Sequence, residues 1–304
     1  MSLLVVGSVA FDAVRTPHGS VDKMLGGSAT YFALAASYFT PVRVVGVVGD
    51  DFEERHHRVL LDRGVSTEGL ERVPGKTFFW SGEYAPNMND RTTLATELNV
   101  FATFQPKLPP LYRDSPYLFL ANIDPELQAL VRGQMPAARL VGGDTMNLWI
   151  DTKRPALERM LKGLDILVIN DSEARSLSGE WNLAKAGRAI RALGPKTVVI
   201  KRGDNGASVH EEDHVFIAPA LPLEEVRDPT GAGDSFAGGF MGYLASSAGA
   251  NHTSPTARMR RAMIYGSVMG SFAVERFGVE RLQNLTRAEI DDRYSEFRQL
   301  THFD

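Results

Sequence analysis

Short apolar runs rich in β-branched residues alternate with stretches of helical length along most of this chain. Residues 3–6 and 42–48 are two such runs, and the Ala-rich stretch 29–39 between them predicts a helix that stops near Pro41. Further strands are predicted at residues 117–120, 140–142, 166–169 and 197–200. Strands that are apolar throughout are typical of a parallel sheet covered by helices on both faces. The alternation therefore predicts an α/β fold with a mostly parallel central sheet.

Two β-prone segments interrupt this alternation. Within residues 76–98, the stretches 77–80 and 92–96 flank the turn-forming sequence Pro-Asn-Met-Asn-Asp, which predicts an antiparallel hairpin. Residues 13–25 interrupt the first strand–helix unit in a similar way. We expect the two segments to pair into a small sheet that stands off the main body as a lid. The chain is accordingly predicted to be one domain, residues 1–304, with lid insertions at about 13–25 and 76–100.

Capping residues predict where several helices begin. Asp124 followed by Pro125 suits a helix start, because proline is favoured at the first helical position. Asp50 and Asp171 are each expected to cap the helix that follows them. Two long helices are expected near the end of the chain, at about 235–245 and 256–274.

The composition excludes several classes of protein. Lys and Arg total 33 against 37 Asp and Glu, a net charge of −4, whereas a general nucleic-acid binder needs a basic surface. The chain has no cysteine, which excludes disulfides, thiolate nucleophiles and Cys-ligated metals. No apolar run approaches the roughly 18 residues that span a bilayer, and the first residues lack the basic start of a signal peptide. We therefore expect a soluble, cytoplasmic protein with neither nucleic-acid nor membrane partners.

One apparent metal motif is expected to be structural. Residues 210–214 read His-Glu-Glu-Asp-His, which fits the zinc pattern His-Glu-x-x-His. That pattern needs both histidines on one face of a helix. Here the acidic residues join two β-prone runs, 207–210 and 214–218, so we predict a solvated hairpin tip.

Residues 228–234, Asp-Pro-Thr-Gly-Ala-Gly-Asp, carry the strongest functional signal. Gly231 and Gly233 allow a tight turn, and the helical pattern after them places their exposed N–H groups at a helix N-terminus. Such amides hold an anion, for example a transferring phosphoryl group. A carboxylate there is explained if Asp234 takes the proton of an attacking hydroxyl; the alternative is that it only caps its helix. No Gly-Lys-Ser/Thr follows, so this is not a Walker sequence.

This segment is similar to the second signature of the ribokinase-like sugar kinases, the PfkB carbohydrate kinase family, usually Asp-Thr-x-Gly-Ala-Gly-Asp. Pro229 stands where Thr is common, and the resemblance extends over nearly the whole chain. It implies a ribokinase-like three-layer fold with an inserted β-sheet lid. It also implies an ATP- and Mg²⁺-dependent phosphotransferase that acts on a hydroxyl of a sugar or nucleoside. A monovalent-cation requirement and a homodimer formed through the lid stay open.

The resemblance assigns an acceptor side to the site. Asp12 matches the aspartate that hydrogen-bonds substrate hydroxyls, and Gly26-Gly27 matches the substrate-side diglycine at the start of the first long helix. From the residues alone, a carboxylate that accepts two hydroxyl hydrogen bonds suits a polyol. Asp12 is equally explained as a turn cap, and a diglycine is otherwise a weak sign of a turn.

The resemblance assigns a nucleotide side as well. Asn170 and Glu173 match the family's Asn-x-x-Glu, which is associated with magnesium and phosphate, and Glu173 could act on the ion through water. By itself this pattern is more often a helix cap. Lys201, Gly203 and Gly206 match a glycine turn near the nucleotide, and Ser267 lies in the final helix that flanks adenine, where core packing is an equal explanation.

We predict direct in-line transfer. Asp234 deprotonates the acceptor hydroxyl, the amides of Ala232, Gly233 and Asp234 stabilise charge on the phosphoryl group, and the lid excludes water. The alternative is a non-catalytic nucleotide- or sugar-binding sensor of the same fold, against which the intact residues 231–234 argue. A dinucleotide-dependent dehydrogenase is a weaker reading, because no Gly-x-Gly-x-x-Gly follows the first strand.

Overall fold

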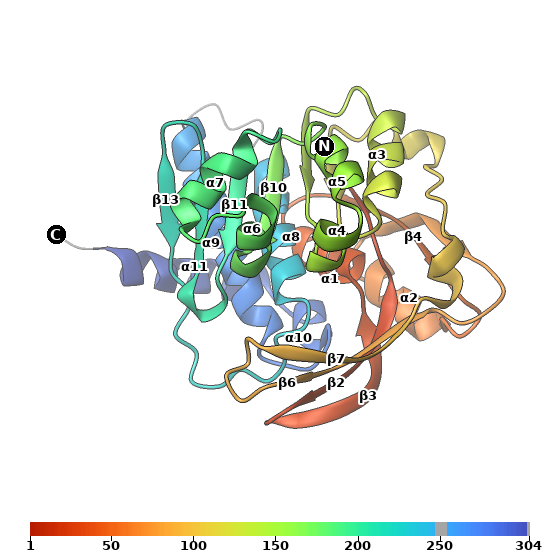
Figure 1. Cartoon of the computed structure of the whole chain (residues 1–304). Coiled ribbons are helices and arrows are strands. Elements are labelled where there is room, and N and C mark those ends of the chain that lie inside the picture. The colour runs from red at the N-terminus through yellow and green to blue at the C-terminus, as the bar shows by residue number, and fades with distance from the viewer. Residues whose placement is uncertain (247–253, 303–304) are drawn as a thin grey trace.

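A nine-stranded sheet forms the centre of the molecule (Figure 1). The computed structural model describes residues 1–246 and 254–302. The strand order is β13-β12-β11-β10-β9-β8-β1-β4-β5, parallel from β11 to β5 and antiparallel at β12 and β13. Its strands are β1 (Leu3–Val6), β4 (Val42–Val48), β5 (Ser66–Arg72), β8 (Tyr117–Leu120), β9 (Leu140–Gly143), β10 (Ile166–Asn170), β11 (Thr197–Lys201), β12 (Ala207–His210) and β13 (Val215–Ala218). The predicted α/β fold with a mostly parallel sheet is confirmed.

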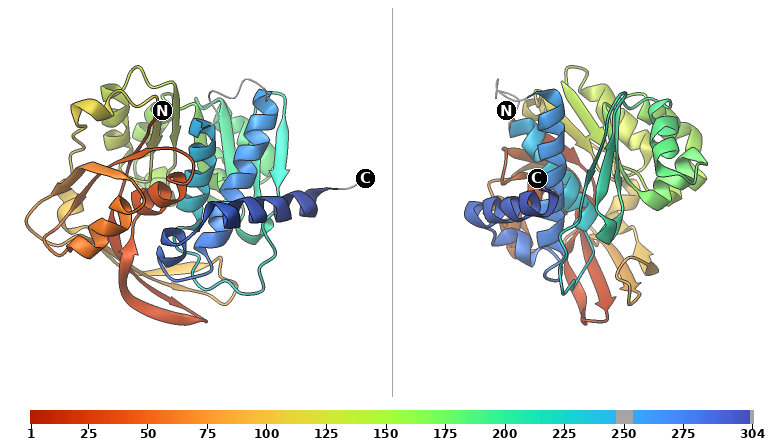
Figure 2. Two further views of the ribbon diagram at one scale, coloured as in Figure 1. Left: turned by 180° about the vertical axis from the view of Figure 1, so that it is seen from behind. Right: turned by 90° about the vertical axis from the view of Figure 1, so that its left-hand side faces the viewer.

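Helices cover both faces of this sheet, which the view along its edge in Figure 2 shows as three layers. Alternate residues of β1 point to opposite layers: Leu3 and Val5 belong to one apolar core, Leu4 and Val6 to the other. The first core contains residues of α1 (Ser28–Ala36), α2 (Glu54–Leu61), α8 (Ala232–Ser246), α9 (Pro255–Ala273), α10 (Glu280–Gln283) and α11 (Arg287–Thr301). The second layer comprises α3 (Pro125–Gln134), α4 (Asn147–Thr152), α5 (Arg154–Leu161), α6 (Asp171–Ser178) and α7 (Leu183–Arg191). Short 3₁₀ turns lie at η1 (Asn99–Thr103), η2 (Pro110–Tyr112) and η3 (Gly203–Asn205).

A separate four-stranded sheet stands below the main sheet in Figure 1. Its order is β3 (Gly19–Gly26), β2 (Ala10–Thr16), β6 (Phe78–Tyr84) and β7 (Arg91–Glu97). Ala10 lies opposite Phe78 in a parallel pairing, while the other two pairings are antiparallel. The predicted pairing of the two inserted segments into a small lid sheet is therefore confirmed.

Two expected helix caps are wrong. α2 is capped by Glu53 instead of Asp50, whose carboxylate accepts a hydrogen bond from the Gly75 amide at 3.1 Å. Asp171 is the first residue of α6, and its cap is Asn170, because the Asn170 side chain reaches the third amide of the helix. In both cases a neighbouring polar residue satisfies the free helix amides first.

Other boundaries follow the sequence more closely. Asp124 caps α3 by accepting a hydrogen bond from the Glu126 amide at 3.0 Å, as predicted. The acidic segment after His210 joins β12 to β13 as a hairpin, also as predicted. α1 ends at Ala36, three residues early, where the Phe39 amide turns back to the Ala36 carbonyl. Among residues 1–246 and 254–302, no helix combines the length and the apolar character needed to cross a membrane.

Candidate active site

The loop before α8 is held in its shape by Asp228. This carboxyl is 1% exposed; Oδ1 accepts from the Thr230 amide and Oδ2 from the Gly278 amide, both at 2.9 Å. Gly231 follows with φ +73°, and a Cβ atom there would lie 2.3 Å from the Tyr31 ring. Only glycine fits such a position, because a side chain would be strained in this conformation and would also collide with the ring.

α8 begins with two amides that no backbone carbonyl engages. The Ala232 amide donates to the Pro229 carbonyl at 3.2 Å, and Ser235 makes the first helical bond, to Gly231, at 2.8 Å. The amides of Gly233 and Asp234 have no carbonyl partner in the described parts of the chain. They are part of the unsatisfied first turn of a helix, which carries partial positive charge. The Asp234 amide donates to its own carboxylate, so two of the three amides that the sequence predicts to hold the phosphoryl group are not engaged by a carbonyl, and only that of Gly233 lacks any partner in the described residues.

Charged groups gather around this first turn. Burial raises the pKa of the Asp234 carboxyl, and the positive charges of Lys201 and Arg91 oppose the rise. The Lys201 ammonium, at the end of β11, lies 2.7 Å from where a Gly233 Cβ would be. Asp144 follows β9; burial and then Asp234 hold its pKa well above the usual range. Two carboxyls and an ammonium group therefore share one small, largely desolvated space.

Asp12 and the diglycine meet on the lid side of the site. Asp12, on β2, is 5% exposed, and a Cβ atom on Gly26 would lie 1.9 Å from its Oδ2 atom. Gly27 caps α1 with φ +95° and donates its amide to the Asp12 carboxylate. Burial, with the charges of Asp228 and Asp234, raises the pKa of Asp12 to about 7. The sequence-predicted acceptor residues and Asp234 thus lie close enough to act on one another.

Asn170 and Glu173 form a reciprocal helix cap. The Asn170 side chain accepts from the Glu173 amide, and Glu173 Oε2 accepts from the Asn170 amide, both at 2.8 Å. Glu173 is nevertheless close to the site, since Lys201, Arg91 and Asp234 all influence its pKa, which burial raises. No three acidic or histidine side chains come together as a metal-binding group within residues 1–246 and 254–302.

The lid tip contacts the turn of Gly203 and Gly206. Both glycines have positive φ, +55° and +78°, and η3 spans most of this turn. Asn89 Nδ2 donates to Asp204 Oδ1 at 3.3 Å, so the end of the lid hairpin reaches the segment predicted to lie near the nucleotide. Ser267 is buried in α9, which packs along α8, and its place beside adenine stays a prediction.

Sequence reasoning missed three side chains of the site. Arg91, at the start of β7, places a positive charge near Asp12, Glu173 and Asp234. The Tyr84 hydroxyl lies 3.2 Å from Thr230 Oγ1 and so connects the lid to the loop before α8. Tyr31 packs under Gly231. Arg91 and Tyr84 flank the predicted turn 86–90. The sequence indicates only that they lie near the tip of a hairpin, and not that this tip reaches the site.

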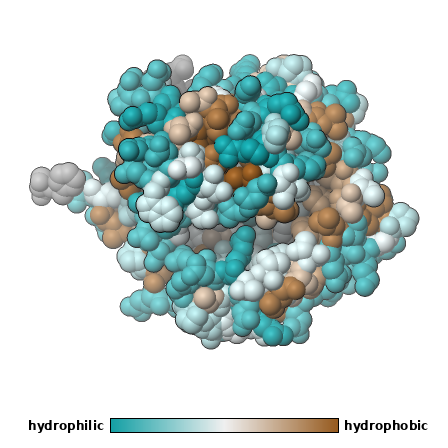
Figure 3. All heavy atoms as spheres, in the orientation of Figure 1, coloured by the Kyte–Doolittle hydropathy of each residue, from teal (hydrophilic) through white to brown (hydrophobic). Residues whose placement is uncertain are grey.

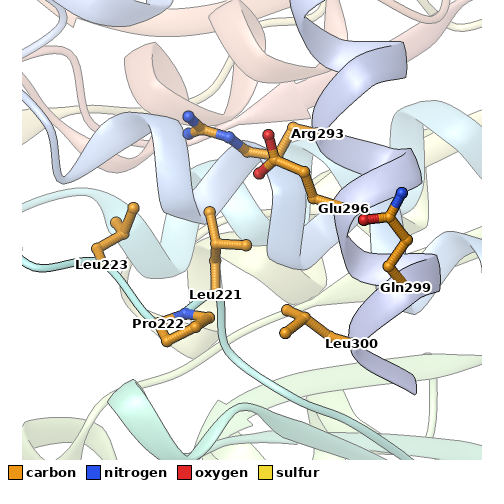
Figure 4. A pocket seen from close by; sticks show the side chains of 7 residues that line it. All are labelled: Leu221, Pro222, Leu223, Arg293, Glu296, Gln299 and Leu300. Carbon is orange, nitrogen blue, oxygen red and sulfur yellow. The ribbon is translucent and has the colours of Figure 1, made fainter. Parts of the chain in front are cut away.

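The surface is hollowed between the main body and the lid (Figure 3). Two other hollows are unrelated to the carboxyl groups described above. One, of about 470 Å³, lies between Leu221–Leu223 and α11, with Arg293 and Leu300 among its walls (Figure 4). The other, of about 520 Å³, is lined by exposed ion pairs such as Arg227–Glu225. Neither contains a predicted site residue.

The comparison with known families identifies the class of protein. Residues 1–285 match the pfkB family of carbohydrate kinases, so the chain belongs to this family. The expected kinase of the carbohydrate or nucleoside class is thereby confirmed. Members of this family phosphorylate a sugar or nucleoside with ATP, which is the activity that the comparisons support for the chain in general terms.

Several relatives are nucleoside kinases. The chain is 29% identical over 250 residues to a cytidine kinase of Thermococcus kodakarensis, covering 80% of this chain and 88% of the relative. It is 27% identical over 316 residues to a nucleoside kinase of Methanothermobacter thermautotrophicus, covering 91% of each. The crystal structure of aminoimidazole riboside kinase from Salmonella enterica, complexed with aminoimidazole riboside and an ATP analogue, superposes with a TM-score of 0.75 at 19% identity, covering 97% of this chain and 100% of that chain. This last likeness shows the ribokinase-like fold.

Proposed function

We propose that this chain transfers the γ-phosphoryl group of ATP directly to a hydroxyl of a nucleoside or sugar, with Asp234 as the general base. The observation that carries the proposal is the first turn of α8, where the Asp234 carboxyl adjoins two amides that no backbone carbonyl engages and the Lys201 ammonium. A base must lie beside the group that gains negative charge, and only a site with such donors makes that arrangement favourable.

The residues of the site divide the charge between them. The amides of Gly233 and Asp234 would hold the oxygens of the moving phosphoryl group, with Gly231 shaping the loop, while the Ala232 amide contributes less because Pro229 already accepts from it. Lys201, at the end of β11, and Arg91, at the start of the lid strand β7, would add positive charge. The raised pKa of Asp234 suits a base that must accept a proton near neutral pH.

The carboxyl groups fit a magnesium ion that draws most of its ligands from phosphate and water. Asp144 Oδ1 is buried without a hydrogen-bond partner in the described residues, and Glu173 has one carboxylate oxygen engaged by its own helix cap. Mg²⁺ is usually held by one or two carboxylates together with phosphate oxygens. We propose that Glu173, with Asn170 orienting it, faces this ion, which would neutralise phosphate charge when bound.

The remaining assignments complete the proposal. The 203–206 turn with Lys201 would receive the nucleotide, and Ser267 would lie near its base. The seating of Asn89 on Asp204 supports a lid that closes over both substrates. A homodimer through the lid and a monovalent-cation requirement stay open, and a cytoplasmic location stays a prediction.

An acceptor panel tests the function. We expect ADP release with Mg-ATP and at least one of cytidine, adenosine, aminoimidazole riboside and ribose, with nucleosides favoured because relatives are named cytidine and nucleoside kinases. The readout is coupled ADP formation together with mass analysis of the phosphorylated acceptor. A ligand that raises the melting temperature without any ADP release would support the sensor alternative and contradict the proposal.

Asp12 should make acceptor binding depend on pH. Only the ionised carboxyl accepts two hydroxyl hydrogen bonds, and its pKa is raised to about 7. We expect the acceptor Kd, measured by calorimetry, to rise as pH falls below about 7, by up to tenfold per pH unit, while the Kd of an ATP analogue stays level.

Asp12→Asn is the control for this pH effect. The folded chain keeps the Asp12 proton up to about 7 whereas the unfolded chain loses it near 3.8, so this group's stability contribution falls as pH rises between those values. The variant should therefore melt at a higher temperature than the wild type at pH 8, bind acceptor weakly and lose the pH dependence. A wild-type Kd that is level from pH 5.5 to 8 would exclude Asp12 from the acceptor site.

A further inference from the structure

Tyr31 carries a buried hydroxyl that the fold does not use. The residue is 1% exposed, and its Oη atom has no hydrogen-bond partner in the described parts of the chain. Buried tyrosine hydroxyls usually find a partner, as Tyr112 does with Ser66 at 2.7 Å and Tyr84 does with Thr230 at 3.2 Å. An unpaired buried hydroxyl lowers the stability of the folded chain, so phenylalanine at this position would give a more stable fold.

The position of this phenol is fixed from two sides. Tyr31 lies in the first turn of α1, where its amide donates to the Gly27 carbonyl at 3.2 Å. Its ring lies against Gly231, so close that a Cβ atom added to this glycine would be 2.3 Å from the ring. The side chain therefore spans the short gap between the diglycine that contacts Asp12 and the loop that begins α8.

The groups around the hydroxyl belong to the site. Burial and the charges of Asp12, Asp228 and Asp234 raise the pKa of Tyr31 well above its ordinary value, so the hydroxyl stays protonated and able to donate. Four other buried oxygens without partners lie at the starts of α1 and α8 and just after β9: Thr30 Oγ1, Ser235 Oγ, Asp144 Oδ1 and Thr145 Oγ1. In the described residues the other buried atoms without partners are the Nε atoms of three arginines, Arg202, Arg258 and Arg293, so every such hydroxyl or carboxyl oxygen lies on these segments, as expected where a polar ligand completes them.

We propose that the Tyr31 hydroxyl is a specificity-determining part of the acceptor site and hydrogen-bonds a ligand oxygen next to the hydroxyl that Asp12 holds. This inference rests on the proposed function, because it takes the ligand of Asp12 to be a polyol such as a ribose ring. An acceptor that lacks the second oxygen leaves the buried phenol unpaired, and such a site rejects the deoxy analogue strongly. The substrate class is therefore one with two neighbouring oxygens, and a monohydroxy alcohol is excluded.

Tyr31→Phe separates this role from a structural one, because its two effects have opposite directions. The variant keeps the ring under Gly231 and removes only the unpaired hydroxyl, so the ligand-free protein should melt about 2 °C higher. Its acceptor Kd, measured by calorimetry, should rise about 3–10-fold, with the Kd of an ATP analogue unchanged. Tyr112→Phe is the matched control: it removes the bond to Ser66, so it should melt lower and bind acceptor as the wild type does.

Deoxy analogues complete the experiment. The probe is whichever of cytidine, adenosine and ribose binds the wild type most tightly, together with its single-deoxy derivatives. The wild type should bind one deoxy derivative more weakly than the parent compound. The Tyr31→Phe variant should bind that derivative and the parent compound with the same Kd. If phosphoryl transfer proceeds but Tyr31→Phe matches the wild type on every analogue, or melts lower as Tyr112→Phe does, the inference alone fails. If a probe binds and no transfer occurs, the proposed function fails while binding still decides the role of Tyr31. Binding to none of the probes overturns both.

Discussion

Asp234→Asn is expected to lower kcat by about 10²–10⁴-fold, because it removes the proton acceptor and leaves the remaining site in place. Asparagine has nearly the same shape, so the amides of the first α8 turn and the Lys201 ammonium should keep their positions. The substitution also removes a carboxyl whose pKa burial raises, meaning that its ionised form is disfavoured in the fold. The melting temperature should therefore stay the same or increase. Initial rates of ADP formation and a thermal melt measure both effects.

A second aspartate distinguishes catalysis from capping. Asp124 caps α3 through the Glu126 amide, and asparagine is as good a cap as aspartate. Asp124→Asn should therefore leave kcat unchanged, with a small loss of stability from the half-exposed ion pair to Lys153. If Asp234 were only a cap, the two substitutions would behave alike. Wild-type turnover in Asp234→Asn would show that another group accepts the proton.

The parts of the fold that the sequence predicts are those with a local cause. Apolar strands such as β1 must be covered on both faces, and turn chemistry at residues 86–90 closes a hairpin whatever lies around it. The sequence does not predict β5, because its residues Ser-Thr-Glu-Gly-Leu-Glu-Arg are mostly polar, as those of an edge strand can be. Several polar residues precede α2, so the sequence alone does not distinguish Asp50 from Glu53 as its cap, and the path of the chain selects Glu53.

The candidate site likewise contains residues that a local sequence pattern predicts and residues that it does not. The 228–234 segment combines its glycines, its helix start and its aspartate within one turn, so its geometry follows from its own sequence. Arg91 and Tyr31 have no such signature. Tyr31 lies in an apolar stretch that looks like core, and Arg91 lies in a polar lid strand that looks exposed. Each joins the site only because β7 and α1 begin near the loop before α8, which is a property of the tertiary structure.

Gly231→Ala is expected to lower kcat by about 10²–10³-fold, the effect of losing one preorganised donor in a charge-stabilising site. The added methyl group would lie 2.3 Å from the Tyr31 ring in a backbone conformation with φ +73°, so the loop must move or the ring must turn away. A shifted loop displaces the Gly233 and Asp234 amides, and either change lowers the melting temperature.

Gly133→Ala is the matched control for this prediction. Gly133 lies in α3, and nothing is within 4 Å of the Cβ atom that the substitution adds. Alanine is the better helix former, so this variant should be more stable by about 0.5–1 kcal/mol and keep full activity. The double variant Gly231→Ala with Tyr31→Ala then tests the cause. Removing the buried ring relieves the collision but leaves a cavity and the strain from positive φ, so the double variant should lose less stability than the two single variants added together. If Gly231→Ala retained wild-type kcat, the loop would not need its present shape, and the free amides of α8 would have no role in holding the phosphoryl group.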